Sequence, residues 1–430
     1  MKIRKLHIKN YKVFNDLQLD FTDANGNTLD KIVLAGVNGC GKTTILELIK
    51  KMFDRTLFTS QNEFLASEIL MEVELLDSEK TSILSALYLL KGLIEEIPKF
   101  KEACDNCINY LLSTKKYYSF TFKGKKEYNS LDTFFLFSQT SMADYTRLPN
   151  LLYLPVHLKD PDISISKTNI ITDITKTEAD KNTVLRIVHL ESSKEDMKNL
   201  ALGSVRKEIF ENMDTPPRES IENAIKKINA ILGDIELSTK LVDLKADDLI
   251  FKSINGQRVT FEDLSNGEKI LYFRAIYIGM LNLKNSIIMI DEPEGALHPS
   301  WQQKILKSYQ SLGENNQIIV ATHSPHIIGA SKAEEVFLLE INENQVGVMH
   351  PKYTKGHSIG YILEEMGAAP NETVVIDKVN DYLTLLRKGL QDTEKGLKLK
   401  EEIDALDLDP NSEEMRRLDL SIKRFKVVGV

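Results

Sequence analysis

The sequence predicts an α/β protein with antiparallel strands at its N-terminus, a helical insertion and a short helical C-terminal region. Three largely apolar runs, at 32–35, 286–290 and 317–321, have the length of buried strands; the first is followed by a glycine-rich segment and the other two by polar residues. Strict alternation of apolar and polar residues at the N-terminus indicates strands with one buried face. Elsewhere apolar residues recur at helical spacing, which predicts helices.

The N-terminal strands are predicted at 2–9 and 17–21, where apolar and polar residues alternate. We expect these two segments to pair with each other. The cations that they bring to this first sheet are Lys2, Arg4, Lys5, Lys9 and Lys12. We interpret them as a solvated face in preference to a nucleic-acid surface.

The glycine-rich segment at 36–43 matches G-x-x-x-x-G-K-[ST] and stands between the strand at 32–35 and a helical run at 44–49. This context predicts a P-loop, in which glycines let backbone N–H groups close around phosphate oxygens. Lys42 is expected to reach the β- and γ-phosphates, Thr43 to ligate Mg²⁺, and Cys40 to contribute only its backbone. The helix N-terminus adds positive potential. The expected nucleotide contacts are Asn38, Gly39, Cys40, Gly41, Lys42, Thr43 and Thr44.

A second helix start is predicted at the pentapeptide Leu-Ser-Asn-Gly-Glu, residues 264–268. The Ser265 hydroxyl and the N–H groups of a helix N-terminus can meet a γ-phosphate. Ser265, Gly267 and Glu268 are therefore candidate nucleotide contacts.

The strand at 286–290 leads into Asp291 and Glu292. Asp291 suits Mg²⁺ binding, and Glu292 suits a general base that orients and polarises an attacking water molecule. A helix N-cap is the alternative role of paired acids, but it explains the complete set of motifs poorly. His323 follows the third apolar run and can donate to a γ-phosphate, so the candidate catalytic residues are Glu292, His323 and Lys42.

Walker A, signature, Walker B with its glutamate, D-E-P-E-x-x-L-H-P and T-H-S-P follow one another along the chain. In this order they resemble the ABC-class ATPases, specifically the RecF, SMC and OLD-like branch. We assign 1–55 and 235–348 to the ATPase lobes, 56–234 to an inserted lobe of strands and helices, and 349–430 to the helical C-terminal region. The signature has Asn-Gly-Glu in place of Gly-Gly-Gln. The Q-loop has no assigned residue, and its candidates are Gln139, His157 and Lys159.

The resemblance implies a P-loop NTPase fold of the ABC ATPase type that hydrolyses ATP with Mg²⁺. It also implies that the signature of one subunit faces the P-loop of another. A chain with one P-loop and one signature would then complete its sites as a symmetric homodimer, or as a higher oligomer built from it. ATP would close the dimer and hydrolysis would open it.

The interval 56–234 is expected to contain strands at 71–75 and 151–155. Helices are expected at 78–112 with a break near Pro98, at 182–213 and at 215–232. Bases and aromatics mix on a predicted hairpin at 115–126, which we interpret as an amphipathic hairpin rather than a nucleic-acid contact. Cys104 and Cys107 form an isolated C-x-x-C, interpreted as spare thiols on a helix.

Composition sets broad limits on the class of protein. At 430 residues, two or three lobes are expected. The net charge of −8 gives no overall attraction to nucleic acid but permits a local basic groove. Three cysteines provide no disulfide framework, which fits the cytoplasm. The sequence contains no pattern of a signal peptide or a membrane span, so no membrane partner is expected.

The C-terminal region has helical patterns at 371–388, 394–406 and 412–425. The run Gly-His-Ser-Ile-Gly-Tyr-Ile-Leu-Glu-Glu-Met at 356–366, with the helical tail that follows, resembles the Septu-type ATPases of bacterial anti-phage defence. No nuclease is recognised in this region, so the resemblance implies a separate nuclease effector under the control of the ATPase. The alternatives are a RecF-like DNA repair ATPase that binds DNA directly and a non-catalytic scaffold whose ATP is structural.

Overall fold

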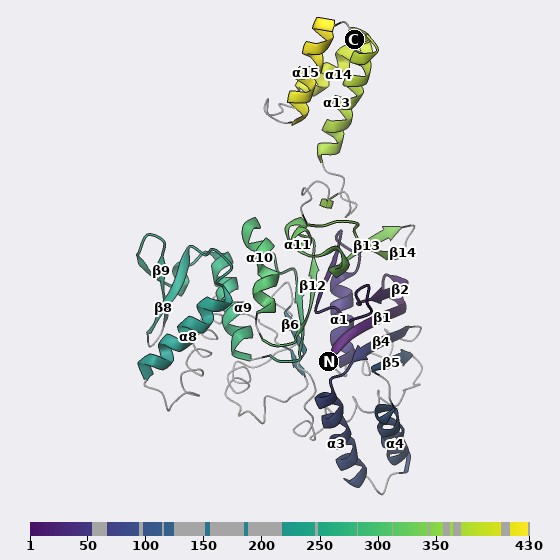
Figure 1. Cartoon of the computed structure of the whole chain (residues 1–430), viewed down its shortest axis with the longest axis vertical. Coiled ribbons are helices and arrows are strands. Elements are labelled where there is room, and N and C mark those ends of the chain that lie inside the picture. Colours follow the sequence, from purple (N-terminus) through teal and green to yellow (C-terminus); the bar gives the residue numbers. More distant parts are fainter. Residues whose placement is uncertain are drawn as a thin grey trace. The chain divides into compact units, whose positions relative to one another are not determined.

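The computed structural model describes residues 1–53, 67–93, 98–113, 116–123, 151–154, 185–187, 217–245, 248–281, 283–311, 313–342, 345–355, 362–363, 371–405 and 413–428. The chain divides into two compact units, Met1–His357 and Ser358–Val430. Figure 1 labels their helices and strands. Within the described ranges, no helix has the length and apolar character needed to cross a membrane.

The largest sheet of unit 1 carries the P-loop strand. Its order is β14-β13-β3-β12-β11-β6-β7, and the described neighbours are parallel except β13 and β14. The strands are β3 (Lys31–Gly36), β6 (Leu151–Leu154), β7 (Leu185–Ile187), β11 (Ile287–Asp291), β12 (Gln317–Thr322), β13 (Val336–Asn342) and β14 (Gln345–Met349). Every residue of β11 and β12 is buried, which explains their continuous apolar sequences.

Helices of unit 1 pack around this sheet. The first of them, α1 (Lys42–Phe53), leaves the P-loop and packs against β3, β11 and β12. After β11 and β12 the chain forms α10 (Pro299–Gln310) and α11 (Pro325–Ala330), which pack against each other. The helix that begins in the 264–268 pentapeptide is α9 (Asn266–Leu281).

The N-terminal strands belong to a separate antiparallel sheet of order β2-β1-β4-β5. Its members are β1 (Lys2–Tyr11), β2 (Phe14–Asp20), β4 (Glu68–Glu74) and β5 (Tyr117–Lys123). Leu6 stands opposite Leu19 on one side and Met71 on the other, and all three side chains are buried. The predicted pairing of 2–9 with 17–21 is therefore confirmed.

The polar side chains of this sheet are largely ion-paired, in agreement with a solvated face. The pairs are Lys2–Asp30, Arg4–Glu72, Lys5–Asp20 and Lys116–Glu74, and His7 Nε2 lies 2.5 Å from Asp16 Oδ1. Arg4 also lies 3.9 Å from the ring centroid of Tyr117, on the strand where bases and aromatics mix. These partners leave less positive charge for a polyanion than the sequence suggests.

Gln317, at the start of β12, joins the first sheet to the main sheet. Its Oε1 accepts from the Ile3 N–H at 2.7 Å, and its Nε2 donates to the carbonyls of Ile3 and Leu29 at 2.8 and 2.9 Å. The β1–β2 ladder begins only at Lys5, so the side-chain amide satisfies backbone groups of Ile3 that lie beyond the ladder. Gln317 is fully buried.

A third sheet, of order β10-β9-β8, was not anticipated from the sequence. It consists of β8 (Thr239–Lys245), β9 (Asp248–Ser253) and β10 (Arg258–Thr260). The predicted helix at 215–232 is confirmed as α8 (Pro217–Ile231), which packs against β8 and α9. Phe251 of β9 lies 4.7 Å from Tyr272 of α9 between ring centroids, so this sheet supports the signature helix.

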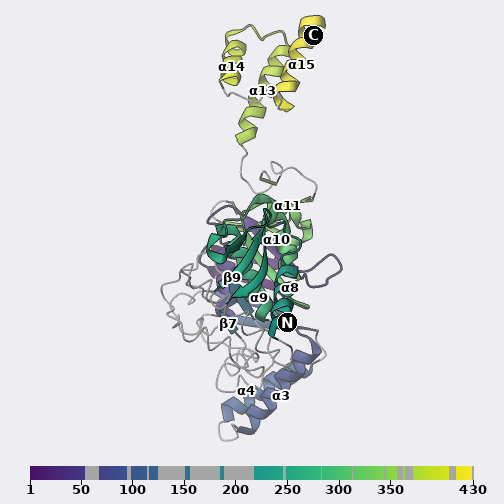
Figure 2. The same ribbon diagram turned by 90° about the vertical axis from the view of Figure 1, so that its left-hand side faces the viewer.

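The described strands of the interval 56–234 join two sheets of unit 1. Of these, β4 and β5 belong to the first sheet, and β6 and β7 extend the main sheet. The predicted break near Pro98 is confirmed, because α3 (Asp77–Leu93) and α4 (Pro98–Leu112) form a hairpin that projects from the sheets (Figures 1 and 2). Cys104 and Cys107 are buried on α4 and form no disulfide bond within the described part of the chain. The prediction of a helix at 182–213 is wrong at residues 185–187, which form β7.

Unit 2 contains α13 (Asn371–Arg387), α14 (Glu394–Asp404) and α15 (Glu413–Val428), which confirms the three predicted helices. The side chain of Thr393 accepts from the Gly396 N–H and caps α14. The helices share a core of Val379, Tyr382, Leu383, Leu386, Ile403 and Leu418.

Candidate active site

Three motifs that are distant in the sequence meet at one edge of the main sheet. Thr322 stands opposite Ala35, and Asp291 stands opposite Ala321. Because β3, β12 and β11 are parallel, their carboxyl ends lie at the same edge, where ligands bind in open α/β sheets. The P-loop, the paired acids and His323 are therefore side by side.

The P-loop is shaped by two glycines in backbone conformations that side chains rarely adopt. Gly36 has φ +143°, and a Cβ there would lie 2.4 Å from the carbonyl oxygen of Leu339. Gly41 has φ +95°, and a Cβ there would lie 2.4 Å from the ring of Phe14. These positions require glycine. Of the predicted contacts, Asn38, Gly39 and Thr43 are exposed, Gly41 and Thr44 are partly buried, and Cys40 and Lys42 are buried.

Lys42 holds the loop from within. Its Nζ donates to the carbonyls of Gly36 at 2.9 Å and Val37 at 3.0 Å, and lies 3.8 Å from Cys40 Sγ. Charged phosphate oxygens are stronger partners for an ammonium than neutral carbonyls are. A phosphate in the loop can therefore recruit Lys42 with a change in its side chain alone.

Asp291 ends β11 in a buried position, and neither of its carboxylate oxygens accepts a well-formed hydrogen bond from a described residue. Burial raises the pKa of Asp291 to about 6, and the charge of Glu292 acts in the same direction. The Thr43 hydroxyl and the Lys42 ammonium act in the opposite direction and only partly offset this rise. A buried carboxylate without such a donor suits a bound cation, because the cation would compensate its negative charge.

The residues beside Asp291 fit Mg²⁺ better than an all-protein metal cage. No group of three or more His, Cys, Asp or Glu side chains with metal-binding geometry exists among the described residues. Mg²⁺ is commonly held by one or two protein oxygens together with substrate phosphates and water. Thr43 and Asp291 supply such a pair, and Thr43 is exposed.

Glu292 follows Asp291 with φ +43°, a conformation that is strained for any residue other than glycine. Its N–H donates to the Ala321 carbonyl at 2.8 Å, so the strained residue is held by the neighbouring strand. His323 Nδ1 lies 3.4 Å from Glu292 Oε1 and 3.5 Å from Glu294 Oε1. The structure thus brings Glu292 and His323 together, as their predicted roles require.

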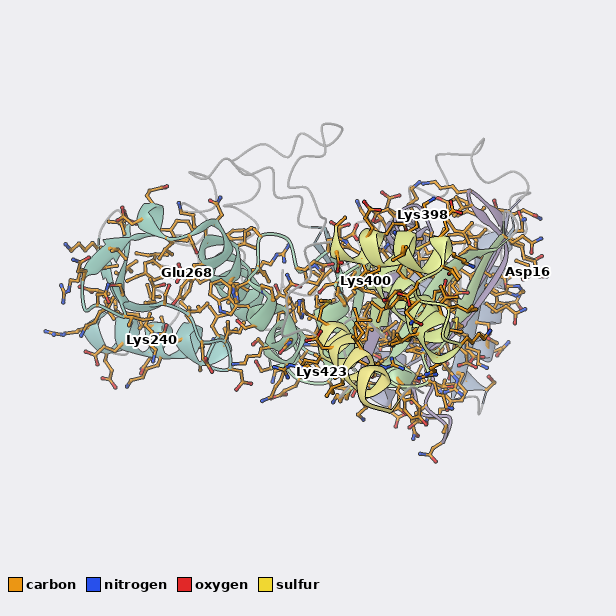
Figure 3. The ribbon with its side chains drawn as sticks, turned by 90° about the horizontal axis from the view of Figure 1, so that it is seen from above. Asp16, Lys240, Glu268, Lys398, Lys400 and Lys423 are labelled. Atoms are coloured by element: carbon orange, nitrogen blue, oxygen red, sulfur yellow. The ribbon has the colours of Figure 1, made fainter. Side chains whose placement is uncertain are left out.

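Glu268, one of the predicted nucleotide contacts, has its carboxylate engaged by residues of its own chain. Its side chain is buried, with Oε1 accepting from Ser238 Oγ at 2.7 Å and Thr239 Oγ1 at 2.9 Å. Its Oε2 accepts from Ser265 Oγ at 2.9 Å and from the Ser265 N–H at 3.3 Å, and the Glu268 N–H donates to Ser265 Oγ at 3.3 Å, which completes a capping box at the start of α9. Burial pushes the pKa of Glu268 up, but these hydrogen bonds outweigh it and the pKa is lowered overall. The carboxylate therefore ties the start of α9 to Thr239 of β8; Glu268 is labelled in Figure 3.

The other two signature candidates differ in exposure. Ser265 is exposed, although its hydroxyl takes part in the capping box. Gly267 is buried, and a Cβ there would lie 2.6 Å from the Ala296 carbonyl and 3.2 Å from the Trp301 ring. Gly267 is thus required for close packing of α9 against the turn that follows Glu292. Only Ser265 presents its side chain to the exterior.

Sequence reasoning missed Glu294, the second glutamate of D-E-P-E. Its side chain is 7% exposed and hydrogen-bonds the backbone of His323. The D-E-P-E motif was the available signal, but sequence spacing alone does not show that the third residue after Asp291 turns back toward β12. The Q-loop candidates Gln139, His157 and Lys159 lie outside the described residues.

Comparison with known proteins decides the family. Residues 1–328 match the model of a family described as the AAA ATPase domain. The chain belongs to this family of ATPases. Its activity is therefore ATP hydrolysis, its ligand is a nucleotide, and the predicted α/β P-loop fold is confirmed.

The ATPase is similar along most of its length to two curated proteins. It is 23% identical to the retron Ec83 probable ATPase of Escherichia coli, over 99% of this chain and 87% of that protein. It is also 23% identical to the retron Vc95 probable ATPase of Vibrio cholerae, over 93% and 86%. The Septu protein PtuA of Bacillus thuringiensis is 30% identical over 32% of this chain and 38% of its own length. The predicted Septu-type resemblance is thereby confirmed.

Solved structures with a detectable likeness to the ATPase include SMC heads. The SMC head domain from Thermotoga maritima is 12% identical with a TM-score of 0.41, over 82% of this chain and 100% of that one. An SMC head bound to the C-winged helix domain of ScpA is 12% identical with a TM-score of 0.45, over 82% and 98%.

Proposed function

We propose that this chain is a Mg²⁺-dependent ATPase that acts as a homodimerising switch in bacterial anti-phage defence and controls a separate nuclease effector in the cytoplasm. The observation that carries the proposal is the grouping of Lys42, Thr43, Asp291, Glu292 and His323 at one sheet edge. The names of the relatives support the defence setting, since they are retron ATPases and a Septu protein.

In the proposed reaction, Glu292 takes a proton from water as the water oxygen bonds to the γ-phosphorus. The bond from the γ-phosphorus to the β–γ bridging oxygen breaks, and ADP leaves with the electron pair. Lys42 and His323 stabilise charge on the γ-phosphate oxygens. Mg²⁺ held by Thr43 and Asp291 would neutralise charge on the β- and γ-phosphates.

The proposed dimer supplies the part of the site that one chain lacks. Ser265 is exposed at the start of α9 and makes no hydrogen bond with a P-loop residue in the part of the chain that is described. A two-fold dimer places two such serines opposite two P-loops. ATP then favours the closed dimer through its contacts with both subunits.

Subunit complementation tests this arrangement. Lys42→Ala removes P-loop function, and Ser265→Arg blocks the signature, so each homodimer should be inactive. A mixed dimer retains one site, formed by the intact P-loop of one subunit and the intact signature of the other. Random mixing makes half of the dimers mixed, so equal amounts should recover about a quarter of wild-type kcat.

The matched control is a mixture of Lys42→Ala with a Lys42→Ala, Ser265→Arg double variant, which contains no intact P-loop and should remain inactive. Full activity of Ser265→Arg alone, or absence of recovery in the first mixture although size-exclusion chromatography shows mixed dimers, would contradict the head-to-tail site.

A second candidate function, direct binding of nucleic acid, is favoured by one row of cations on the third sheet. Lys240, Lys252 and Arg258 are cross-strand neighbours and all three are exposed. Like charges directly opposite each other destabilise a sheet. None of the three forms an ion pair with a described residue, whereas Lys307 of α10 pairs with Asp234 at 2.8 Å. Lys240 is labelled in Figure 3. A phosphate backbone would relieve this repulsion.

A further inference from the structure

Glu294 holds the segment that carries His323. Its Oε1 accepts from Thr322 Oγ1 at 2.6 Å and from the His323 N–H at 2.9 Å. The Thr322 hydroxyl in turn accepts from the Ser324 N–H at 2.9 Å. Glu294 Oε2 is buried without a hydrogen-bond partner among the described residues. Burial of a carboxylate is unfavourable unless it is paired, so these two bonds to Oε1 fix its position.

The residues on both sides of His323 are anchored while its ring remains accessible. Ser324 Oγ donates to Gln302 Oε1 at 2.6 Å, and Thr322 is fully buried. The His323 side chain is 49% exposed, and its Nδ1 lies between the carboxylates of Glu292 and Glu294 at 3.4 and 3.5 Å. The ring therefore has a defined place beside the strained Glu292.

We propose that Glu294 is a positioning residue for ATP hydrolysis, whose carboxylate oxygen aligns the His323 backbone and ring beside Glu292. The inference rests on the proposed function, in which Glu292 and His323 face the γ-phosphate. Glu294 acts through His323, since its hydrogen bonds join the turn after β11 to the end of β12. Small displacements of catalytic groups are costly, and about 1 Å of misplacement can lower a rate by about a hundredfold.

Two substitutions separate the hydrogen-bonding role of Glu294 from its charge. Glu294→Gln keeps an oxygen acceptor at the same reach without the charge. Glu294→Asp keeps the charge but is shorter by one methylene and cannot reach both donors. We expect Glu294→Asp to lower kcat by about 10- to 100-fold with KM for ATP within about threefold of wild type. For Glu294→Gln, both kcat and KM for ATP should stay within about threefold of the wild-type values. The reverse order, or equal kcat in both variants, overturns the proposal.

A double-mutant cycle with His323→Ala tests whether Glu294 acts through His323. If it does, Glu294→Asp should cause no further loss of kcat in the His323→Ala protein. The same loss in both backgrounds overturns the positioning role, although the role of His323 would stand. An unchanged kcat for His323→Ala alone would instead contradict the proposed function.

Circular dichroism and thermal unfolding establish that each variant is folded. If Glu294→Asp does not fold, Thr322→Val provides a second test of the proposal. This substitution removes one hydrogen-bond donor to Glu294 Oε1 and leaves the carboxylates of Glu292 and Glu294 in place. Thr322→Val should lower kcat with little change in KM. A wild-type kcat in folded Thr322→Val would overturn the proposal.

Discussion

At the scale of single residues, the carboxylate of Asp291 is buried where the described residues supply no well-formed hydrogen-bond donor. Burial raises its pKa to about 6, above the ordinary value of 3.8. Below about pH 4 the carboxyl is protonated in both the folded and unfolded chains and brings no penalty. As pH rises from about 4 through 6, the unfolded chain ionises more readily, so the metal-free fold loses stability and stays at that lower level above about pH 6.

Asp291→Asn should therefore raise the Tm of the metal-free protein at pH 7.5, because the amide is isosteric and carries no charge to desolvate. The difference in Tm should become small near pH 4, and the variant should lose Mg²⁺-dependent ATPase activity. Differential scanning calorimetry in EDTA checks the first part. If the Tm of Asp291→Asn were lower than that of wild type by the same amount at pH 7.5 and near pH 4, burial of the ionised carboxylate would not destabilise the fold.

At the scale of elements, the active edge depends on how the first sheet is attached to β12. Gln317 makes three hydrogen bonds to the backbone of Ile3 and Leu29 at one end of β12, and His323 follows the other end. The N-terminal hairpin also reaches the P-loop, since Phe14 is the contact that excludes a side chain at Gly41. The first sheet therefore buttresses both the P-loop and the strand before His323.

Gln317→Leu should lower the free energy of unfolding of unit 1 by at least about 3 kcal/mol, because it leaves three buried backbone groups without partners. Urea denaturation followed by circular dichroism measures the loss as a lower midpoint. Gln310→Leu, at the exposed end of α10, makes the same chemical change outside the core and should shift the midpoint little. Equal midpoints for the two variants would contradict the role of Gln317 as a joint between sheets.

At the scale of the whole molecule, a net charge of −8 opposes binding to a polyanion, and four cations of the first sheet, Lys2, Arg4, Lys5 and Lys12, are already paired. Any direct binding of nucleic acid must then come from a local surface. The row of Lys240, Lys252 and Arg258 is such a surface, and electrostatic patches act over a Debye length of about 8–10 Å despite the total charge.

Replacing the three cations of this row with alanine should weaken binding to a DNA duplex at 50 mM salt. It should also reduce the slope of log K against log salt by about 2 to 3, or about 0.9 for each phosphate that the variant no longer neutralises. Fluorescence anisotropy across a salt series measures both quantities. Lys307→Ala is the control, because its cation is paired with Asp234. An unchanged slope in the triple variant would exclude the row as a nucleic-acid surface.

The sequence by itself determined the three strands that carry the site, the P-loop and the identity of the acids, because buried strands need apolar runs and phosphate binding needs glycines and a lysine in a fixed order. The sequence left the third sheet undetected, since β10 has only three residues and the alternation in β8 is interrupted by a bulge between Leu241 and Asp243.

Only the tertiary structure decided which carboxylates face the site. Glu268 is turned inward by Ser238 and Thr239, which precede it by about 30 residues, and Glu294 is joined to Thr322 and His323 across two strands. Sequence spacing cannot distinguish a glutamate that contacts a ligand from one that caps a helix or fixes a neighbouring strand, because the difference lies in partners brought together by the fold.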